Sequence, residues 1–426
     1  MFQPPRPPTV FLLSQGDEVI TGQTVDTNAA TLSEWLTELG FLVTRRVTVG
    51  DVMHDIVAAI AEGLNSADVL ICTGGLGPTA DDLTAEALGT VLGVPLVLHE
   101  PSLEHIQAIF TLIGRRMSDA NRKQAMLPQG ATPLQNNFGT APGFSVESPR
   151  QGQAPAVGYF LPGVPREMKG MWAEHLKPDL IRRFSLSPGR LITFRCMGAP
   201  ESQLEEIMRP FQGIDGVTVG FRAMSPEVQV KLRVRPDVTD ERLIPLIAQV
   251  QAAIGKAVFG VDTGALEDVI VAALIERGET LATAESCTGG RLSAAITSVA
   301  GASAAFMEGA CVYANEAKMR TCDVDAGALA QYGAVSEIVA RQLAEGIRER
   351  AGTTYGLSTT GVAGPGGGTP EKPVGTVHVA LATPQGTFHR QLRLGGDRDR
   401  ITRYAAASAL DLLRRHLQGV LHGDNL

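Results

Sequence analysis

The stretch Ala284–Gly290 (AESCTGG) brings together a hydroxyl, a thiol and two adjacent glycines. A strand-like run, residues 280–284, precedes it, and apolar residues at helical spacing follow it. We therefore expect a corner between a strand and a helix, where the first N–H groups of the helix lack partners. Ser286 at such a corner is a candidate nucleophile, because those N–H groups suit an oxyanion. The rival nucleophile is Cys287, and the alternative role for Ser286 is a helix cap.

A candidate proton acceptor lies in Tyr313–Lys318 (YANEAK). Lys318 can act as a base only if burial or a neighbouring cation lowers its proton affinity, and Tyr313 can then orient or relay the proton. The alternatives are that Lys318 is a surface cation and that Tyr313 is a packing residue. His378 and His389 fall in strand-like runs, where structural roles are expected, so a serine–histidine triad is not indicated. The favoured chemistry is a metal-free serine/lysine hydrolase.

A second chemical motif, Thr73–Thr84 (TGGLGPTADDLT), follows an apolar strand in the N-terminal part. Its glycines allow a phosphate to approach the main chain, and Asp81 and Asp82 can hold a hard cation that neutralises a pyrophosphate. The alternative is a glycine turn followed by an aspartate that begins a helix. A further polar set follows the first strand: Asp17, Asp26 and Asn28. The two loops can therefore converge on one ligand.

The elements that must position these residues form three regions. Strands expected at 10–14, 41–47 and 67–72 alternate with helices, which favours a parallel sheet covered on both faces. A helix at 165–180 closes this region. Residues 191–261 follow a split β-α-β pattern, to which we assign spacing and dimer contacts. Its strand at 228–234 has Lys231 and Arg233 on a face that is better explained by solvent than by nucleic acid.

The last region is expected to be a separate α/β domain. It combines a helix at 266–277, a helix that starts at Ser336, a strand at 356–359 and a hairpin of strands 376–382 and 388–394. The final helix carries one apolar stripe: Tyr404, Ala407, Leu410 and Leu413. The predicted domains are residues 1–187, 188–263 and 264–426.

These motifs resemble the competence-damage-inducible A (CinA) family over nearly the whole chain. The resemblance rests on Thr73–Thr84, Asn121–Ala125, Gly139–Gly143, Leu161–Met168, Ala284–Gly290, Tyr313–Lys318, Gly333–Glu337, Gly361–Gly364 and Lys372–Val377. It implies an N-terminal three-layer domain of the molybdopterin-binding type, a small α+β module and a C-terminal nicotinamide mononucleotide (NMN) deamidase domain.

For the N-terminal domain the resemblance implies hydrolysis of ADP-ribose to AMP and ribose 5-phosphate, with a divalent metal and K⁺. The implied nucleotide site is Asn28, Gly74, Gly75, Gly77 and Thr79, and the implied metal ligands are Asp81 and Asp82. For the C-terminal domain it implies conversion of NMN to nicotinate mononucleotide and ammonia without a cofactor. The implied roles are Ser286 as nucleophile, Lys318 as base, Tyr313 as assistant, Thr288, Gly289, Gly290, Thr360 and Gly361 as pocket residues, and Arg398 or Arg400 as phosphate ligand.

Composition limits the other possibilities. The chain has 426 residues, a net charge of -8 and no dense basic block, so nucleic-acid binding is not supported. Five cysteines without CxxC spacing fit a reducing compartment. Residues 1–8 lack the pattern of a signal peptide and no apolar run reaches a membrane-spanning length, so a cytoplasmic protein is expected.

Three functions remain in competition at this point. The first is a bifunctional pyridine-nucleotide salvage hydrolase that acts on NMN and ADP-ribose. The second is a molybdopterin-binding protein of cofactor assembly, which would leave the C-terminal domain without a role. The third, implied by the family name alone, is an accessory protein of competence or DNA repair, with a recombinase as a conceivable partner. We expect a homodimer, because parallel sheets with open edges and a spacer module offer surfaces for pairing.

Overall fold

In the computed structural model, residues 6–186 and 189–421 are described. The chain folds into two compact units, Met1–Arg190 and Leu191–Leu426. Each unit contains its own sheets and buried apolar clusters. Among the described residues, no helix is both long enough and apolar enough to cross a lipid bilayer.

The first unit is built on a six-stranded sheet with the order β2-β1-β3-β8-β7-β6. Its strands, with a two-stranded β4-β5 ribbon, are β1 (Thr9–Gln15), β2 (Leu42–Val49), β3 (Val69–Thr73), β4 (Leu96–Leu98), β5 (Met126–Pro128), β6 (Thr132–Leu134), β7 (Gly143–Arg150) and β8 (Gln153–Leu161). Its helices are α1 (Asp17–Ile20), α2 (Thr27–Glu38), α3 (Met53–Ser66), α4 (Thr84–Leu92), α5 (Glu100–Leu112), the 3-10 helix η1 (Asp119–Ala125), α6 (Pro165–Met171), the π turn η2 (Trp172–Leu176) and α7 (Lys177–Arg183).

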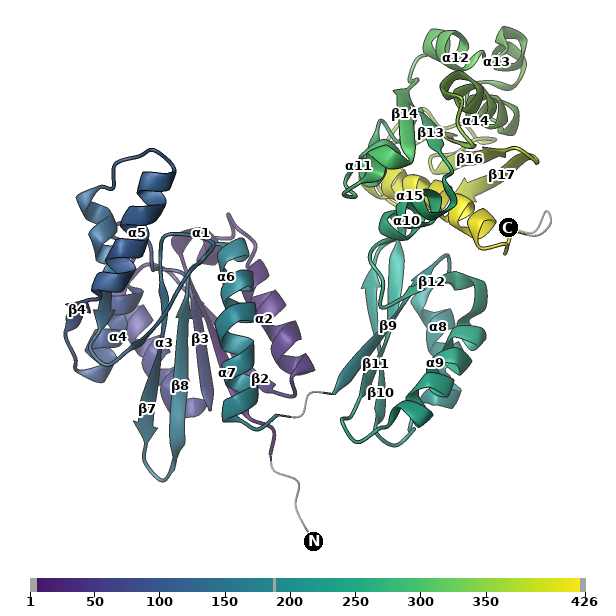
Figure 1. Cartoon of the computed structure of the whole chain (residues 1–426). Coiled ribbons are helices and arrows are strands. Elements are labelled where there is room, and N and C mark those ends of the chain that lie inside the picture. Colours follow the sequence, from purple (N-terminus) through teal and green to yellow (C-terminus); the bar gives the residue numbers. More distant parts are fainter. Residues whose placement is uncertain (1–5, 187–188, 422–426) are drawn as a thin grey trace. The chain divides into compact units, whose positions relative to one another are not determined.

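Two apolar cores make this unit a three-layer structure. Helices α2, α6 and α7 cover one face of the sheet, where Leu32, Leu36 and Met171 are buried against β1 and β8. Helices α3 and α4 cover the other face, and α2 and α6 lie on the same side in Figure 1. The expected alternation of strands and helices is confirmed. The expectation of a parallel sheet holds for β2, β1, β3 and β8, whereas β7 and β6 are antiparallel. No crossover helix connects these strands: residues 135–142 join β6 to β7, and a turn at residues 151–152 joins β7 to β8.

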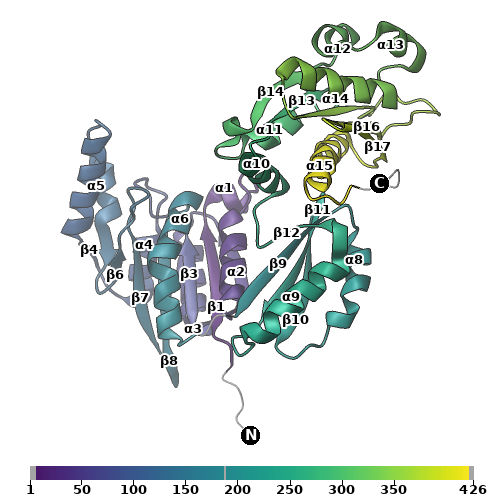
Figure 2. The same cartoon turned by 45° about the vertical axis from the view of Figure 1, so that its right-hand side comes forward.

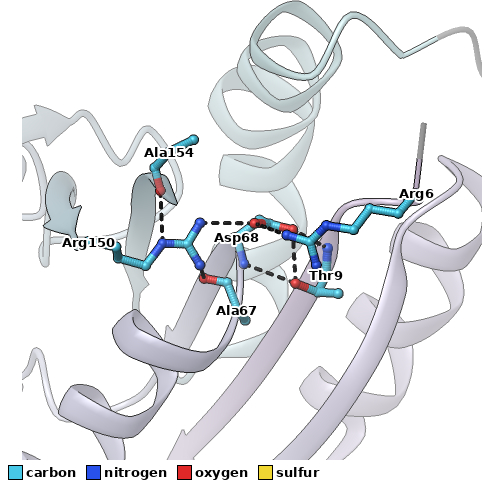
Figure 3. Close-up of polar contacts among 6 residues, drawn as sticks. All are labelled: Arg6, Thr9, Ala67, Asp68, Arg150 and Ala154. Carbon is cyan, nitrogen blue, oxygen red and sulfur yellow. Dashed lines mark hydrogen bonds and ion pairs between the residues drawn. The ribbon is translucent and has the colours of Figure 1, made fainter. Parts of the chain in front are cut away.

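An ion-pair cluster fixes the amino ends of β1 and β3 (Figure 3). Asp68 accepts hydrogen bonds from the main-chain N–H and hydroxyl of Thr9, each at 2.9 Å, and pairs with Arg150 at 2.9 Å and Arg6 at 3.2 Å. Burial raises the pKa of Asp68, but the bonds from Thr9 and Arg150 outweigh it, so the pKa lies below its usual range. Ligands bind at the carboxyl ends of such strands, whereas this cluster lies at their amino ends. We therefore assign it a structural role.

The second unit begins with a four-stranded sheet in the order β10-β11-β9-β12. Its elements are β9 (Arg190–Met197), α8 (Glu201–Met208), the 3-10 helix η3 (Arg209–Phe211), β10 (Val217–Met224), β11 (Glu227–Val234), α9 (Asp240–Ile254), the 3-10 helix η4 (Gly255–Ala257) and β12 (Val258–Val261). Helices α8 and α9 pack on one face, where Val230, Leu232 and Val234 of β11 are buried. This is the split β-α-β arrangement expected from the sequence.

The rest of the second unit is organised around a five-stranded sheet in the order β14-β13-β15-β16-β17. Its elements are α10 (Leu266–Arg277), β13 (Leu281–Glu285), α11 (Arg291–Thr297), the 3-10 helix η5 (Ala302–Ala304), β14 (Phe306–Cys311), α12 (Asn315–Cys322), α13 (Ala326–Tyr332), α14 (Glu337–Ala351), β15 (Tyr355–Gly361), β16 (Thr376–Thr383), β17 (Gly386–Arg393) and α15 (Arg398–Leu417). Strands β14, β13 and β15 are parallel, and β16 and β17 form the expected hairpin.

Helices cover both faces of this sheet. Helix α14 packs on one face through Val339, Leu343 and Ile347, and α10, α11 and α15 pack on the other. Figure 2 shows α14 and α15 on opposite sides of the strands. The expected single stripe on α15 is too narrow: Ile401 and Ala405 are also buried, because this helix lies between the sheet and other helices.

Candidate functional site

A pocket of about 570 Å³ lies at the carboxyl ends of β1, β3 and β8 in the first unit. The residues of the implied nucleotide and metal site all line it: Asn28, Gly74, Gly75, Gly77, Thr79, Asp81 and Asp82. Asp26 lines it as well, so the two loops do converge. Asp17 does not line it, because its carboxylate accepts a hydrogen bond from the main chain of Asp51 at 3.0 Å.

The glycines of this loop are required by the packing of the chain itself. Gly74 has φ 106°, and a Cβ there would come within 2.2 Å of the carbonyl oxygen of Gln15. Gly75 has φ 65°, and a Cβ there would meet the hydroxyl of Thr84 at 2.4 Å. Both φ values favour glycine. The loop is therefore held against β1 even before a ligand is considered.

The aspartates of this loop differ in their surroundings. Asp82 accepts hydrogen bonds from the main-chain N–H of Thr79, at 2.8 Å, and from the Thr79 hydroxyl. It closes the turn but does not begin α4, whose N-cap is Leu83, so the alternative of an aspartate that begins the helix is wrong for Asp82. Asp81 is exposed, and a hydrogen bond from Thr79 lowers its pKa. Asp81 therefore stays ionised and open to a ligand.

Asn28 contains a buried acceptor atom without a donor. Its Nδ2 donates to the carbonyl oxygen of Gly163 at 2.7 Å, which fixes the orientation of the amide. Its Oδ1 is buried and has no hydrogen-bond partner among the described residues, although the side chain is only 8% exposed. A buried acceptor of this kind is stabilised by a hydrogen-bond donor or a cation.

The charges of this pocket suit a cation. Its lining includes carboxylates and, in the part of the chain that the structure describes, neither lysine nor arginine: the acidic residues are Glu18, Asp26, Asp51, Asp81, Asp82 and Glu167. No group of three or more His, Cys, Asp or Glu side chains is preassembled for a metal within the described ranges. Mg²⁺ commonly binds through one or two carboxylates and the phosphates of its substrate. The donor set therefore fits a divalent ion that arrives with a phosphorylated ligand.

In the second unit, Ser286 lies directly after β13, and its main-chain N–H donates to Thr359 of β15 at 2.9 Å. The side chain is 8% exposed, and its hydroxyl makes no hydrogen bond to any other described residue. The expected corner between a strand and a helix is present, and α11 begins at Arg291.

The side chain of Glu285 accepts hydrogen bonds from the N–H groups at the start of α11, which were expected to be free for an anion. The fully buried carboxylate accepts hydrogen bonds from the N–H groups of Gly290, at 3.0 Å, Leu292, at 3.0 Å, and Ser293, at 2.8 Å. It also accepts from the hydroxyls of Thr288, at 2.7 Å, and Ser293, at 2.6 Å. The expectation that the helix amides stabilise an oxyanion is therefore wrong for these amides, because a buried carboxylate needs several donors.

The turn before the helix provides the free N–H groups instead. Those of Cys287, Thr288 and Gly289 have no acceptor among the described residues. All three residues line a pocket of about 420 Å³, together with Arg291, Tyr313, Arg398, Asp399 and Thr402. The N–H groups of this corner that could bind an anion thus lie one turn earlier than the helix.

Lys318, on α12, is 1% exposed. Its Nζ donates to the main-chain carbonyls of Val312, at 3.0 Å, and Tyr313, at 2.9 Å. Burial lowers the pKa of Lys318. The amine lies near the corner, because the main-chain N–H of Val312, whose carbonyl it contacts, donates to the carbonyl oxygen of Glu285 at 2.7 Å. The alternative of a surface cation is therefore wrong.

Tyr313 and Arg398 meet at the pocket. The side chain of Tyr313 is exposed, and its hydroxyl accepts a hydrogen bond from Arg398 Nη2 at 3.1 Å. Arg398 Nη1 donates to the carbonyl oxygen of Gly364 at 2.7 Å. Arg398 therefore joins the loop after β15 to the pocket wall, and Tyr313 is not a packing residue.

The other residues named from the sequence lie beside this pocket or outside it. The hydroxyl of Thr360 donates to Ala334 at 2.8 Å, and Gly361 is held close to Val377 of β16. Gly290, with φ 100°, precedes α11. Arg400 donates to Gly395 at 2.5 Å, lies over the ring of Tyr404 at 4.8 Å and does not line the pocket.

Sequence reasoning missed four residues at this site: Glu285, Arg291, Asp399 and Thr402. Glu285 was visible inside the AESCTGG motif, but only the fold shows that its carboxylate turns inward. Arg291 and Asp399 form an ion pair across 108 residues of sequence, which no local pattern indicates.

Comparison with known proteins matches a different family model to each of the two units. The family model described as "Probable molybdopterin binding domain" matches residues 11–182, and the one described as "CinA C-terminal domain" matches residues 263–417. A "CinA-like protein" of Anaeromyxobacter sp. (strain Fw109-5) is 47% identical over 412 residues, covering 96% of this chain and 99% of its own. A "CinA-like protein" of Shewanella sediminis is 40% identical over 413 residues, covering 96% of both chains.

Among solved structures, a competence/damage inducible protein from Agrobacterium tumefaciens is 36% identical, with a TM-score of 0.35. The match covers 36% of this chain and 97% of that protein. The full-length identity to the CinA-like relatives and the two matched domains together show that this chain belongs to the CinA family.

Proposed function

We propose that the C-terminal part of the chain hydrolyses the amide of NMN to give nicotinate mononucleotide and ammonia. The observation that carries this proposal is the buried amine of Lys318, which donates to two carbonyls beside the turn of Ser286. A neutral amine has two N–H groups and one lone pair. When both N–H groups are directed to carbonyls, the lone pair is left to accept a proton.

The reaction that follows has two steps. The hydroxyl oxygen of Ser286 attacks the amide carbon, and Lys318 accepts the hydroxyl proton and delivers it to the leaving nitrogen as the C–N bond breaks. Water then attacks the resulting ester; Lys318 accepts a proton from the water and returns it to the Ser286 oxygen as the ester C–O bond breaks, and the acid is released. The free N–H groups of Cys287, Thr288 and Gly289 would stabilise the negative charge on the amide oxygen in both steps.

The pocket also has the charge that a mononucleotide requires. Arg398 presents a guanidinium to the pocket and is anchored by Tyr313 and Gly364. Arginine binds phosphate well because its planar fork matches two oxygens. We therefore assign to Tyr313 the role of holding Arg398 in place, in addition to any role in proton relay.

We further propose that the N-terminal pocket cleaves the pyrophosphate of ADP-ribose with a divalent cation. Support comes from the acidic lining, which would repel a pyrophosphate unless a metal accompanied it. Asp81 and Asp82 are the residues that would hold the metal, and it would supply neutralisation of the phosphate charge. K⁺ is a further requirement carried over from the family resemblance.

The test of the amide reaction is ammonia release from NMN by the purified full-length chain. Ser286→Ala and Lys318→Ala should each reduce turnover on the order of a thousandfold, and the double variant should lose little more, because the two residues act as a unit. Independent, multiplying losses would contradict a shared step. No ammonia from the wild type, with tight binding of a pterin by the first unit, would favour the cofactor-assembly alternative instead. A protein that lacked all of these activities but bound a recombinase would favour the competence alternative.

A further inference from the structure

An ion pair lies at the wall of the C-terminal pocket. Arg291, the first residue of α11, donates through Nη2 to Oδ1 of Asp399, near the start of α15. Both residues line the pocket of about 420 Å³. Their side chains are 46% and 53% exposed, so solvent weakens the attraction between them. This pair can therefore be exchanged for another partner at low cost.

The two pocket cations, Arg291 and Arg398, differ in how firmly they are held. Arg398 is anchored by hydrogen bonds to Gly364, at 2.7 Å, and to the hydroxyl of Tyr313, at 3.1 Å. In the described part of the chain, the guanidinium of Arg291 is held by Asp399 alone. Arg291 is thus the cation that can move toward a ligand.

Asp399 does not depend on Arg291 for a counter-ion. It also accepts a hydrogen bond from Arg403, one turn further along α15, at 2.7 Å. If Arg291 turned to a ligand, Asp399 would remain paired with Arg403. The exchange would therefore leave no carboxylate without a partner.

We propose that Arg291 is a specificity-determining residue that leaves Asp399 and binds the phosphate of the mononucleotide substrate. This inference rests on the proposed amide reaction, and it names the group that distinguishes a mononucleotide from its riboside. A phosphate dianion offers more charge than a carboxylate and accepts two parallel bonds from a guanidinium. Asp399 opposes binding of the phosphate, because it also lines the pocket, carries a charge of the same sign and competes for Arg291.

Because Arg291 and Asp399 carry opposite charges, neutralising Arg291 should raise KM for NMN and neutralising Asp399 should lower it. Arg291→Gln should raise KM for NMN about tenfold or more and leave kcat and the KM for nicotinamide riboside nearly unchanged. Arg291→Lys keeps the charge and should recover part of the loss. Asp399→Asn removes the competitor and should lower KM for NMN severalfold. Steady-state ammonia release with both substrates measures these ratios.

A matched control is the exposed pair of Arg350 and Glu308, which are 2.7 Å apart and do not line the pocket. Arg350→Gln removes the same charge and should leave the preference for the mononucleotide as in the wild type. If it changed that preference equally, the effect would belong to the net charge and the inference would be wrong. The inference would also be wrong if Arg291→Gln kept the wild-type preference, or if it impaired both substrates equally.

Failure of the amide reaction is distinguishable from failure of this inference. If the wild type released no ammonia from NMN, calorimetric titration of NMN and of the riboside would still report binding. A wild type that favours NMN, and an Arg291→Gln variant that does not, would support the role of Arg291 without any turnover. Equal binding of both ligands by the wild type would reject it.

Discussion

At the scale of single residues, the C-terminal site depends on where protons are held. Lys318 is buried among groups that accept its hydrogen bonds but do not carry a negative charge, since Val312 and Tyr313 contribute main-chain carbonyls. Carbonyls orient the amine without the strong stabilisation of the cation that a carboxylate would give. This is how a lysine can be ordered and still accept a proton.

The thiol of Cys287, next to Ser286 in the sequence, keeps its proton instead of accepting or giving one up. Burial raises the pKa of Cys287 to about 12, so the thiol is protonated at neutral pH and is a poor nucleophile. We expect Cys287→Ala to retain at least roughly a tenth of the wild-type turnover on NMN, with its loss arising only from the space left in the core. A covalent acyl adduct trapped on a peptide containing Ser286, rather than on the thiol, is the matching observation by mass spectrometry. An inactive, folded Cys287→Ala together with an active Ser286→Ala would overturn the serine mechanism.

The sequence predicted the residues of this site better than their contacts. Ser286 and Lys318 were identified because hydroxyl and amine groups have recognisable chemistry, whereas Arg398, with Arg400 as its alternative, was implied by the resemblance to the CinA family. The role of Glu285 could not be predicted, because a carboxylate is buried only where the fold supplies donors, and its main-chain donors lie at the start of α11. The exchangeable partner of Arg291 lies on another helix, α15.

At the scale of elements, the prediction succeeded where the hydrophobic pattern was regular. The buried stripe of α14 and the hairpin of β16 and β17 follow directly from their spacing. Strand β14 was not predicted, since Phe306–Cys311 (FMEGAC) has little β-branched content and forms a strand only by pairing with β13. The antiparallel pair β7 and β8 was missed for a related reason, since its turn at residues 151–152 gives a weak signal.

We expect the hairpin of β16 and β17 to make the second unit sensitive to acid. His378 and His389 stack, with ring nitrogens 2.8 Å apart, and His389 lies 3.5 Å from Glu337. Burial, with a smaller contribution from the charge of His389, lowers the pKa of His378 from 6.5 to about 4, although Glu337 acts in the opposite direction and Lys372 adds to the lowering. The unfolded chain therefore binds more protons between these values, and stability should fall as pH drops from about 6.5 toward 4.

Replacement of this histidine should reduce that loss. We expect His378→Leu to lose less stability than the wild type as the solution is acidified from neutral pH to about pH 5, measured by hydrogen exchange of peptides from β16 and β17. Tryptophan fluorescence is unsuitable here, because the two tryptophans, Trp35 and Trp172, stack on each other in the first unit. His54→Gln is the control, since His54 is on the surface of the first unit. An unchanged acid response in His378→Leu would place the sensitivity elsewhere.

At the scale of the whole molecule, the two sites belong to different compact units. The acidic pocket is formed within Met1–Arg190 and the pocket beside Ser286 within Leu191–Leu426. Each unit has complete apolar cores of its own, so loss of a ligand-binding charge in one should not unfold the other. The products of NAD breakdown include both proposed substrates, which would give one chain two related tasks.

This independence is tested most sharply at Asp82, because its carboxylate both closes a turn and carries a charge. In Asp82→Asn, the amide oxygen can still accept from the Thr79 N–H, now 2.8 Å from the carboxylate, so the loop should keep its shape. We expect the variant to lose ADP-ribose cleavage on the order of a hundredfold or more at a fixed Mg²⁺ concentration, while ammonia release from NMN stays within about twofold. Added Mg²⁺ should restore part of the cleavage, since the charge that attracts the cation is reduced rather than the loop destroyed. A parallel loss of both activities in a folded variant would show that the units are coupled, and full retention of cleavage would move the metal to other carboxylates of the pocket, such as Asp26 or Asp51.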